Sequence, residues 1–317
     1  MAGLFSDNEL KKRLRRFWPG KVRWHVAMAE LTTLKVGGPA QALVMPENRD
    51  EVLRLINGCR SGKIPFYVVG GGSNLLVTEA GLAGLVIGLD RNFGEIRRVG
   101  KDGRGRTLVE VEAGCRLARL LNWCADRDLS GLEFAAGIPG TVGGAVVMNA
   151  GARGGEIKDV VAALTWLTGG ETVKKDRREL DFAYRALLRP DDAVVLSALF
   201  ALNPGDGIAI RKLCRERVAE RRRGQPTAHG LAGSFFKNPE GAAAGKLIEE
   251  AGLKGTAIGG AMVSELHANF IVNTGKATAA DIIRLMDLVQ ARVWEVHGVK
   301  LEPEVKIVGG IPEKEKR

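Results

Sequence analysis

Cysteine, histidine and aromatic residues are scarce in this sequence of 317 residues. None of its four cysteines forms a C-x-x-C pair, which argues against a zinc ribbon and against a disulfide framework. Its four histidines include no H-E-x-x-H motif and no close pair, so we expect no metal site. Free thiols suit a reducing compartment, and the sequence therefore predicts a cytoplasmic protein.

Long apolar runs and several common catalytic motifs are also missing. No segment reaches 18 uninterrupted apolar residues, and the N-terminus turns polar at Ser6, so we expect neither membrane insertion nor export. There is no P-loop, no G-x-S-x-G elbow, and no Rossmann G-x-G-x-x-G after a strand. A dinucleotide, if one is bound, must be held in another way.

The net charge of +10 is concentrated in two segments. Residues 1–25 and residues 211–223 each carry seven basic and two acidic side chains, an excess of five. Such patches could bind nucleic acid or phosphorylated small molecules, or could be solvated helix faces. The aromatic content of 5% and the absence of groove-reading motifs weigh against a nucleic-acid partner.

Hydrophobic periodicity and turn residues predict an α+β chain in four parts. These parts are a basic helix in 1–24, a first domain in 25–203, a second in 206–308 and a loose tail in 309–317. The first domain should contain helices near 49–61 and 117–124, and the second should contain helices near 210–218, 242–251 and 279–297. The expected strands are 40–45, 66–69, 85–89, 108–112, 160–167, 193–200, 269–273 and 304–308.

Two glycine-rich loops stand out in the first domain. The first, at 70–74, reads Gly-Gly-Gly-Ser-Asn and follows a predicted strand. The second, at 137–144, leads into the uncharged run 145–152. Consecutive glycines let backbone N–H groups converge on an anion. A single such loop is most simply a turn, but two in one domain favour a cofactor that carries a diphosphate.

Two segments of the second domain could supply polar side chains to a site. Residues 233–239 read Gly-Ser-Phe-Phe-Lys-Asn-Pro, which is either a fixed loop presenting polar groups or a turn with a hydrophobic anchor. On a strand, Glu302, Glu304 and Lys306 would face one way. A carboxylate with a lysine two residues further along is usually an ion pair on the surface, but it could also be an acid in a cleft.

Six motifs in one order carry a family resemblance: 70–74, 137–152, 182–185, 233–239, 267–273 and 301–306. Together they resemble the UDP-N-acetylenolpyruvoylglucosamine reductase family, in its shorter second type because 183–192 is a short connection. The resemblance covers about residues 20–308. It implies a two-lobed FAD-binding domain of the vanillyl-alcohol-oxidase (PCMH) type, followed by an α/β substrate-binding domain.

The resemblance implies an enzyme of bacterial peptidoglycan precursor synthesis. It would use NADPH and non-covalent FAD to reduce UDP-N-acetylglucosamine enolpyruvate to UDP-N-acetylmuramate, and it would be a monomer. Arg185 would polarise the substrate carboxylate, Ser234 would donate a proton to carbon, and Glu304 would stabilise the enolate-like intermediate. The family's remaining site residues would correspond to Thr33, Gly37, Gly38, Gly70, Gly71, Gly72, Ser73, Asn74, Gly137, Ile138, Pro139, Gly140, Gly143 and Gly144 for FAD, and to Tyr184, Arg222, Lys237, Asn238 and His267 for the substrate.

Some positions depart from the family's pattern. Arg153 replaces a frequent aromatic residue, His229 lies in a segment where proline and serine are more usual, and 186–188 lacks the serine-rich stretch. The nearest alternative is an FAD-dependent oxidase of the same fold. Many such oxidases tether flavin through His or Cys near the first motif, and 31–58 contains neither residue.

Overall fold

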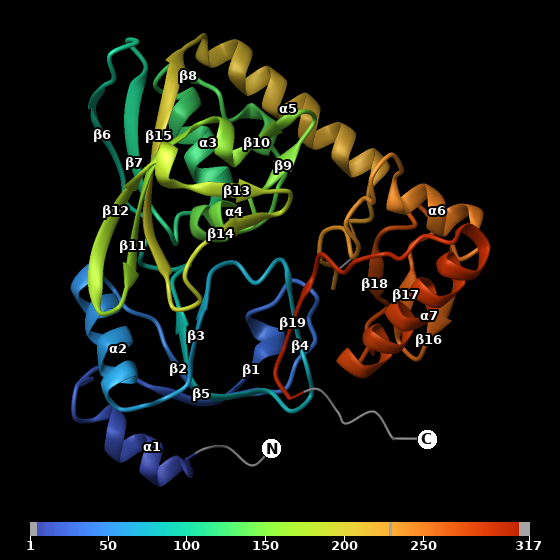
Figure 1. The fold of residues 1–317 in the computed structure, drawn as a ribbon, viewed down its shortest axis with the longest axis horizontal. Coiled ribbons are helices and arrows are strands. Elements are labelled where there is room, and N and C mark those ends of the chain that lie inside the picture. The colour runs from blue at the N-terminus through green and yellow to red at the C-terminus, as the bar shows by residue number, and fades with distance from the viewer. Residues whose placement is uncertain (1–4, 228–229, 311–317) are drawn as a thin grey trace.

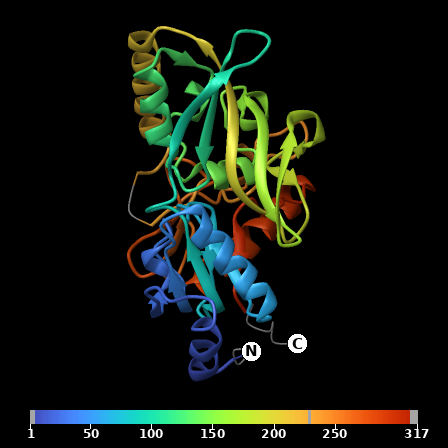
Figure 2. The same ribbon diagram turned by 90° about the vertical axis from the view of Figure 1, so that its left-hand side faces the viewer.

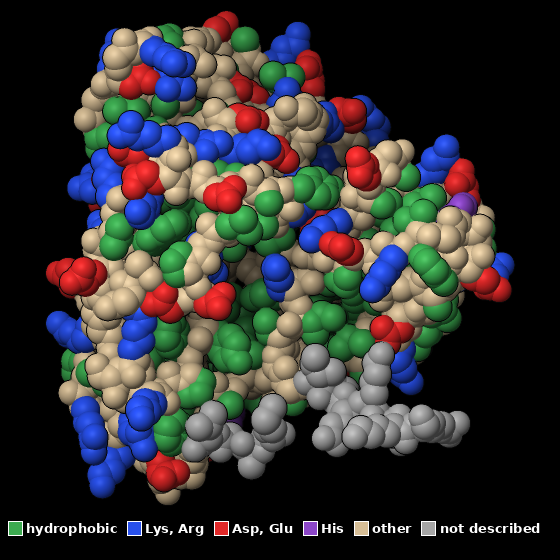
Figure 3. Space-filling model, viewed as in Figure 1, with side chains coloured by type: hydrophobic (Ala, Val, Ile, Leu, Met, Phe, Trp, Pro, Cys, Tyr) green, Lys and Arg blue, Asp and Glu red, His purple; other side chains and the backbone are tan. Residues whose placement is uncertain are grey.

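The computed structural model describes residues 5–227 and 230–310. Parts of three predictions lie outside the described residues: the start of the N-terminal segment 1–24, the position of His229, and residues 311–317 of the tail. In the part that is described, no helix is both long enough and apolar enough to cross a membrane. On the face drawn in Figure 3, Lys and Arg side chains are interspersed with Asp and Glu.

The N-terminal helix packs onto the body of the protein. Helix α1 (Asp7–Leu14) begins with the predicted capping box, in which Ser6 and Glu9 satisfy each other's backbone N–H groups. Leu10 and Leu14 are buried in the main hydrophobic core together with Trp18. The helix ends at Leu14, well before Pro19, so it covers only part of the segment 1–24 in which a helix was predicted.

A four-stranded sheet forms the first lobe, at the lower left of Figure 1. Strand β5 pairs in parallel with β2 and with β3, and the chain passes from β2 to β3 through helix α2. Helix α2 starts at the predicted cap Asn48, which accepts a hydrogen bond from the N–H of Glu51. The elements of this lobe are β1 (Arg23–Ala27), η1 (Met28–Glu30), β2 (Pro39–Val44), α2 (Arg49–Ser61), β3 (Phe66–Val69), β4 (Leu75–Val77) and β5 (Leu82–Gly88).

A larger antiparallel sheet forms the second lobe, in the order β12-β11-β15-β7-β6. Its strands alternate between buried and partly exposed residues, as in β7, where Thr107, Val109 and Val111 are buried. The elements of this lobe are β6 (Ile96–Lys101), β7 (Thr107–Glu112), α3 (Leu117–Ala125), β8 (Leu129–Ser130), η2 (Glu133–Ala135), α4 (Val142–Val147), β9 (Gly151–Ala152), β10 (Gly155–Glu156), η3 (Ile157–Asp159), β11 (Val161–Thr168), β12 (Glu171–Asp176), η4 (Arg177–Glu179), β13 (Asp181–Ala183), β14 (Ala186–Leu188) and β15 (Val194–Pro204).

The basic helix α5 (Gly207–Gly224) belongs by its contacts to the second lobe. Asp206 caps its start, and the helix packs on α3, β8 and η2. Figure 1 shows it running from the top of the molecule toward the C-terminal unit. These contacts favour a domain boundary near residue 225, at the end of the helix, over the predicted boundary at 206.

The C-terminal unit is built on a small antiparallel sheet with two helices. Helix α7 has the predicted bounds, the predicted capping box between Thr278 and Asp281, and Gly298 in the left-handed conformation at its end. The elements of this unit are α6 (Ala244–Glu250), β16 (Ala257–Ile258), β17 (Ala261–Val263), β18 (Ile271–Asn273) and α7 (Ala279–His297). Figure 2 shows the unit from the side, behind the first two lobes.

The last strand returns to the first lobe. β19 (Lys306–Val308) pairs in parallel with β4. Three residues of the first lobe, Leu34, Val36 and Leu76, also contribute to the core of the C-terminal unit. The predicted strand at 304–308 therefore exists but begins at Lys306. Before it, Pro303 forms only an isolated bridge with Phe236. Residues 301–305 do not form a strand, so the alternation expected there does not apply.

The sequence located most of the regular elements of the first two lobes. All six strands expected between residues 40 and 200 are present, with ends displaced by a few residues. The strands that were missed, such as β1 and β12, are short or largely exposed, so their sequences lack a clear apolar alternation.

Asp281 provides a test of how the C-terminal unit is stabilised. Its carboxylate accepts hydrogen bonds from the N–H groups of Thr278 and Gly260 and pairs with Arg284. These bonds lower its pKa to about 2. Because the folded-state pKa is depressed, the carboxylate stabilises the fold above its unfolded pKa, and this contribution is lost as the pH falls through about 2.

We therefore expect Asp281→Asn to lower the free energy of unfolding by about 1 kcal/mol at neutral pH, since hydrogen bonds to a charged acceptor are stronger than those to a neutral one. Denaturant unfolding at several pH values measures this. The gap between wild type and variant should close below about pH 2. A gap that is independent of pH would contradict the role given to the charge.

Candidate functional site

The main cavity lies between the two glycine loops and the start of the C-terminal unit. Its volume is about 780 Å³, within the range of small-molecule sites. One wall comes from the glycine loops and Thr33, another from the end of α5, and a third from residues 230–233. This is the region where the sequence predicted a cofactor.

The two glycine loops lie against each other. The Ser73 hydroxyl donates a hydrogen bond to the carbonyl of Pro139, at 3.2 Å. A Cβ at Gly71 would come within 2.8 Å of the Gly140 Cα, and a Cβ at Gly70 would collide with the Thr141 hydroxyl. Glycine is therefore required at these positions because the loops approach each other closely.

Five of the residues predicted to bind the cofactor line the cavity: Thr33, Gly70, Gly71, Gly137 and Pro139. Others support the loops from behind. Gly38 would collide with the Glu79 carbonyl if it carried a Cβ, and Gly143 lies against Ala113. The predicted residues outside the lining are Gly37, Gly38, Gly72, Ser73, Asn74, Ile138, Gly140, Gly143 and Gly144.

Thr33 offers a direct indication that the cavity is built for a polar ligand. Its hydroxyl oxygen is buried, and no residue in the described part of the chain hydrogen-bonds to it. The Thr33 backbone is fixed, because its N–H donates to the Gly72 carbonyl and its carbonyl accepts from the N–H of Leu231. A buried hydroxyl without a partner is costly, and a ligand oxygen or nitrogen would satisfy it.

Basic side chains face the same cavity. Arg91, Arg116, Arg221 and Arg222 are among the lining residues, and Arg116 pairs with Asp90. Arg221 is half-buried, and no carboxylate pairs with it among the residues described. Burial and the nearby Arg153 both lower its pKa, so an anion in the cavity would be favourable for it. The residues present fit a diphosphate-bearing cofactor.

Arg221 was missed in the sequence, where the neighbouring Arg222 was assigned to the substrate. Arg222 also lines the cavity but is exposed. Both residues lie in the same basic run near the end of α5. Only the packing of that helix against the second lobe determines which arginine turns inward, so a periodicity argument alone could not distinguish them.

Arg185 and Glu304 form the central ion pair of the predicted catalytic set. The Arg185 Nε lies 3.2 Å from a Glu304 carboxylate oxygen, and both side chains are less than one-fifth exposed. Arg185 sits in the two-residue turn between β13 and β14, next to Tyr184, whose ring lies 4.9 Å from its guanidinium. The structure thus brings together two residues that are far apart in the sequence.

Backbone contacts hold Glu304 in place. Its N–H donates to the Phe235 carbonyl, and its carbonyl accepts from the Asn74 side chain at 3.0 Å. Burial raises the pKa of Glu304, although Arg185 and Lys237 act against this rise. The two effects act in opposite directions, and the net shift of the Glu304 pKa is upward. Asn74, expected at the cofactor, contacts the backbone of Glu304 instead.

Ser234 lies in the loop that runs beside Glu304. Phe235 donates its N–H to the Asn269 carbonyl, and the buried Asn269 side chain bonds to both the N–H and the carbonyl of Phe236. Ser234 itself is half-buried and follows Gly233, which lines the cavity. The loop is therefore fixed, and its buried Phe235 and Phe236 also form the hydrophobic anchor of the other interpretation, so the role of its polar side chains stays a prediction.

The remaining residues predicted to bind substrate have other partners in the structure. Lys237 pairs with Glu302 at 3.1 Å, and the side-chain Oδ1 of Asn238 accepts a hydrogen bond from the N–H of Ala244. The His267 ring accepts a hydrogen bond from the Asn269 N–H and packs edge-on against Phe270. Burial lowers the pKa of His267, so the ring is neutral at physiological pH. Their contacts with substrate stay predictions, as does that of Tyr184.

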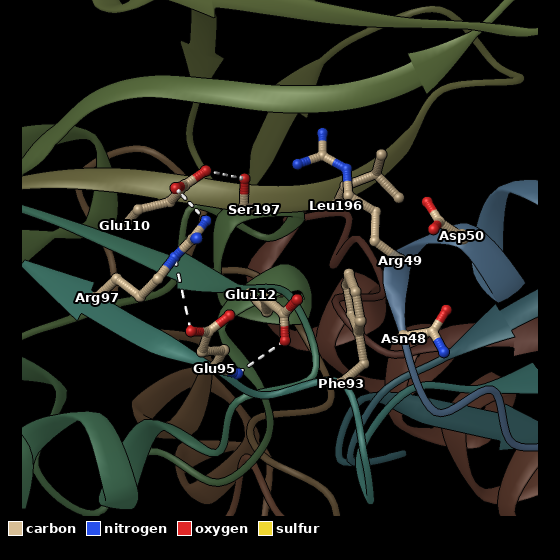
Figure 4. A pocket seen from close by; sticks show the side chains of 10 residues that line it. All are labelled: Asn48, Arg49, Asp50, Phe93, Glu95, Arg97, Glu110, Glu112, Leu196 and Ser197. Atoms are coloured by element: carbon tan, nitrogen blue, oxygen red, sulfur yellow. Dashed lines mark hydrogen bonds and ion pairs between the residues drawn. The ribbon is translucent and has the colours of Figure 1, made fainter. Parts of the chain in front are cut away.

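A second, smaller cavity of about 310 Å³ opens between the two lobes. As Figure 4 shows, Arg97 bridges Glu95 and Glu110, and Ser197 donates to Glu110. Glu112 accepts a hydrogen bond from the N–H of Glu95. Because these polar groups bind one another, the cavity shows no sign of a ligand.

Metal and thiol chemistry find no support in the described residues. No group of three or more His, Cys, Asp or Glu residues in that part of the chain could hold a metal ion. Burial raises the pKa of Cys59 and Cys124 to about 12 and that of Cys115 to about 11, so these thiols are unreactive.

Comparisons with known proteins show the family of this chain. A family model described as "UDP-N-acetylenolpyruvoylglucosamine reductase, C-terminal domain" matches residues 225–308, and an FAD binding domain model matches residues 40–176. The reductase of that name from Desulfosudis oleivorans is 46% identical over 312 residues, covering 96% of this chain and 99% of the relative. This chain belongs to the UDP-N-acetylenolpyruvoylglucosamine reductase family.

Other members support the assignment. The reductase of Caldanaerobacter subterraneus is 44% identical over 311 residues, with 98% of this chain and 99% of the relative covered. The crystal structure of UDP-N-acetylenolpyruvylglucosamine reductase from Thermus caldophilus superposes with a TM-score of 0.76 at 39% identity, covering 90% of this chain and 98% of that one. Family membership confirms the predicted fold class and an FAD-dependent oxidoreductase.

Thr33 allows a test of cofactor binding that does not disturb the glycine loops. Thr33→Val keeps the shape of the side chain and removes the buried hydroxyl. We expect the apoprotein to be stabilised by about 1 kcal/mol, because an unsatisfied buried group is removed. We expect FAD affinity to fall by about tenfold, because a hydrogen bond to the ligand is lost.

Thermal unfolding of the apoprotein and fluorescence titration with FAD measure the two effects. Thr32→Val is the control, since the Thr32 hydroxyl is satisfied by the Val36 carbonyl. It should lower stability and leave flavin affinity unchanged. Unchanged affinity in Thr33→Val would remove Thr33 from the cofactor site.

Proposed function

We propose that this protein catalyses the NADPH-dependent, FAD-mediated reduction of UDP-N-acetylglucosamine enolpyruvate to UDP-N-acetylmuramate. The observation that carries the proposal is the buried pair of Arg185 and Glu304, held 3.2 Å apart beside the glycine loops. An always-charged guanidinium and a carboxyl group with a raised pKa suit the stabilisation of a carboxylate-bearing, enolate-like transition state.

The glycine loops, Thr33 and Arg221 would hold FAD. When bound, FAD supplies hydride transfer, first from NADPH and then to the vinyl carbon of the substrate. The first loop would surround the pyrophosphate with backbone N–H groups, and Arg221 would offset its charge. Residues 31–58 contain no His or Cys, which supports non-covalent attachment.

The substrate's enolpyruvyl carboxylate would bind Arg185. Its guanidinium is already oriented by the Glu304 carboxyl and by the Gly151 carbonyl, so little reorganisation is required during the reaction. Glu304, when protonated, would donate a hydrogen bond to the oxygen on which charge develops. Ser234 would deliver the proton to the neighbouring carbon.

The other parts of the substrate and the cellular setting belong to the same proposal. The exposed Arg222 at the mouth of the cavity would contact the UDP phosphates, and Tyr184, Lys237, Asn238 and His267 would contact the sugar and the enolpyruvyl group. We propose a monomer that acts in the cytoplasm, where the nucleotide-linked precursors of peptidoglycan are made.

The simplest test is the absorption spectrum of the purified protein. It should show flavin bands that NADPH bleaches and that UDP-N-acetylglucosamine enolpyruvate restores. Denaturation should release all of the flavin. A protein without flavin bands, or one whose bands return only with oxygen, would overturn the proposal, the second result in favour of an oxidase.

Arg185 and Glu304 should affect only the second half of the reaction. We expect Arg185→Ala and Glu304→Gln to reduce flavin with NADPH at a nearly normal rate and to slow reoxidation by the enolpyruvyl substrate, because both act on that substrate. Stopped-flow absorbance separates the two steps. If the acid must be protonated, the wild-type reoxidation rate falls as pH rises through the Glu304 pKa, and Glu304→Gln lacks this decline.

Glu302→Gln is the matched control for Glu304→Gln. Glu302 lies two residues away and also interacts with Lys237, but its side chain is 68% exposed. Both half-reactions should stay near wild type. A larger defect at Glu302 than at Glu304 would mean that the other carboxyl group is the catalytic one.

Ser234→Ala should keep flavin, NADPH oxidation and substrate affinity while reoxidation falls by at least about a hundredfold, since general acid catalysis contributes about 10²–10⁴-fold. Ser234→Cys retains a proton and should recover part of the rate. Reoxidation of Ser234→Ala at wild-type speed would show that the proton comes from water or from another side chain.

A further inference from the structure

Arg185 lies between two carboxylates, of which the proposed function uses only Glu304. On its other side, a terminal nitrogen of Arg185 lies 3.8 Å from an oxygen of Glu156. The Glu156 side chain is 21% exposed, nearly as buried as Arg185 at 19%. A third contact, from Arg185 to the Gly151 carbonyl at 3.2 Å, completes the set. The guanidinium is therefore held from several directions.

Glu156 is itself held by partners that keep it ionised. The oxygen that does not face Arg185 accepts hydrogen bonds from Lys158 at 2.7 Å and from Asn149 at 3.0 Å. Burial acts to raise the pKa of Glu156, but these two bonds and the nearby Arg185 outweigh it, and the pKa is lowered. The pKa values of the two carboxyl groups that flank Arg185 are thus shifted in opposite directions, that of Glu156 downward and that of Glu304 upward.

Asn149 connects this arrangement to the backbone that carries Arg185. It is fully buried, and its amide nitrogen donates both to Glu156 and to the carbonyl of Ala183, at the base of the turn. Arg185 has a φ of 57° and Asn149 a φ of 39°, conformations that a residue with a side chain adopts at a cost. Such strain persists only where the surrounding contacts enforce it.

We propose that Glu156 is the positioning residue of the active site: its carboxylate fixes the Arg185 guanidinium and balances its charge on the side opposite Glu304. This rests on the proposed function, in which Arg185 and Glu304 act on the enolpyruvyl group. Glu156 touches neither substrate nor cofactor in this role and acts through Arg185.

The groups facing Glu304 determine the pH signature. Arg185 approaches it from the turn between β13 and β14, and Lys237 from the loop at 233–239. Glu302 pairs with Lys237, and Glu156 lies behind Arg185. Removing the Glu156 charge would leave the positive charge of Arg185 uncompensated. Ionised Glu304 would then be favoured, and its pKa would fall.

Glu156→Gln in the FAD-loaded enzyme tests the proposal, since glutamine keeps the size of the side chain and removes its charge. We expect NADPH-driven flavin reduction to be normal and reoxidation by the enolpyruvyl substrate to slow by about tenfold to a hundredfold, as expected when a reacting group is misplaced. The pH at which reoxidation declines should move down by about one unit. The dissociation constant of the substrate for the oxidised enzyme should rise, because Arg185 binds its carboxylate.

Lys158→Gln is the matched control. It removes the other ion pair of Glu156 and leaves the contact with Arg185 in place. Its reoxidation rate and pH profile should stay near wild type. If Lys158→Gln reproduces the defect of Glu156→Gln, the segment 156–158 acts as a structural unit and the proposal is wrong.

Glu156→Asp keeps the charge, so it should keep the wild-type pH profile and recover much of the reoxidation rate. This variant also tests the proposal if Glu156→Gln does not fold. A displaced profile in Glu156→Asp, or wild-type rate and profile in Glu156→Gln, would overturn the proposal. An unmutated enzyme that the enolpyruvyl substrate cannot reoxidise would instead refute the proposed function, so the two failures are distinguishable.

Discussion

The parallel pairing of β19 with β4 is the contact on which the active site depends. It joins the end of the chain to the strand that directly follows the first glycine loop. Glu304 lies just before β19, so the pairing places it beside Asn74, whose side chain holds the Glu304 carbonyl. Without this return of the chain, Glu304 and the predicted cofactor loop would belong to separate units.

The positive charge of Arg185 has two effects in the proposed site: it would bind the substrate carboxylate, and it lowers the pKa of the neighbouring Glu304. A guanidinium that must bind a substrate carboxylate also stabilises any ionised acid beside it, and would therefore deprotonate Glu304. Burial of Glu304 acts in the opposite direction, and Lys237 acts in the same direction as Arg185. In our proposal, Glu156 on the far side of Arg185 offsets part of the positive charge that Glu304 experiences. The pKa of Glu304 therefore cannot be assigned to any one pair.

The sequence predicted the elements well where local chemistry determines them. Capping residues located the starts of α1, α2 and α7, and alternating apolar residues located the strands of the two lobes. It could not reveal contacts that only the tertiary fold creates. Glu156 lies outside every motif, and the motif 137–152 and the basic run 211–223 do not show what Asn149 and Arg221 contact. These roles depend on a turn and a helix that approach from elsewhere in the chain.

In the glycine loops, glycine is needed for more than one physical reason. Several of their glycines are required because two protein segments meet: Gly70 against Thr141, Gly71 against Gly140, and Gly72, in a left-handed conformation, against Leu31. A side chain at any of these positions would push apart the two segments that meet there, whether or not a cofactor is bound. The same close approach leaves Gly70 and Gly71 on the cavity wall, where a diphosphate could reach the backbone N–H groups. Packing between the loops therefore creates the cofactor surface. For this reason, the loss of flavin on substituting one of these glycines would not by itself identify a contact with the ligand, whereas the hydroxyl of Thr33 can be removed without altering the packing.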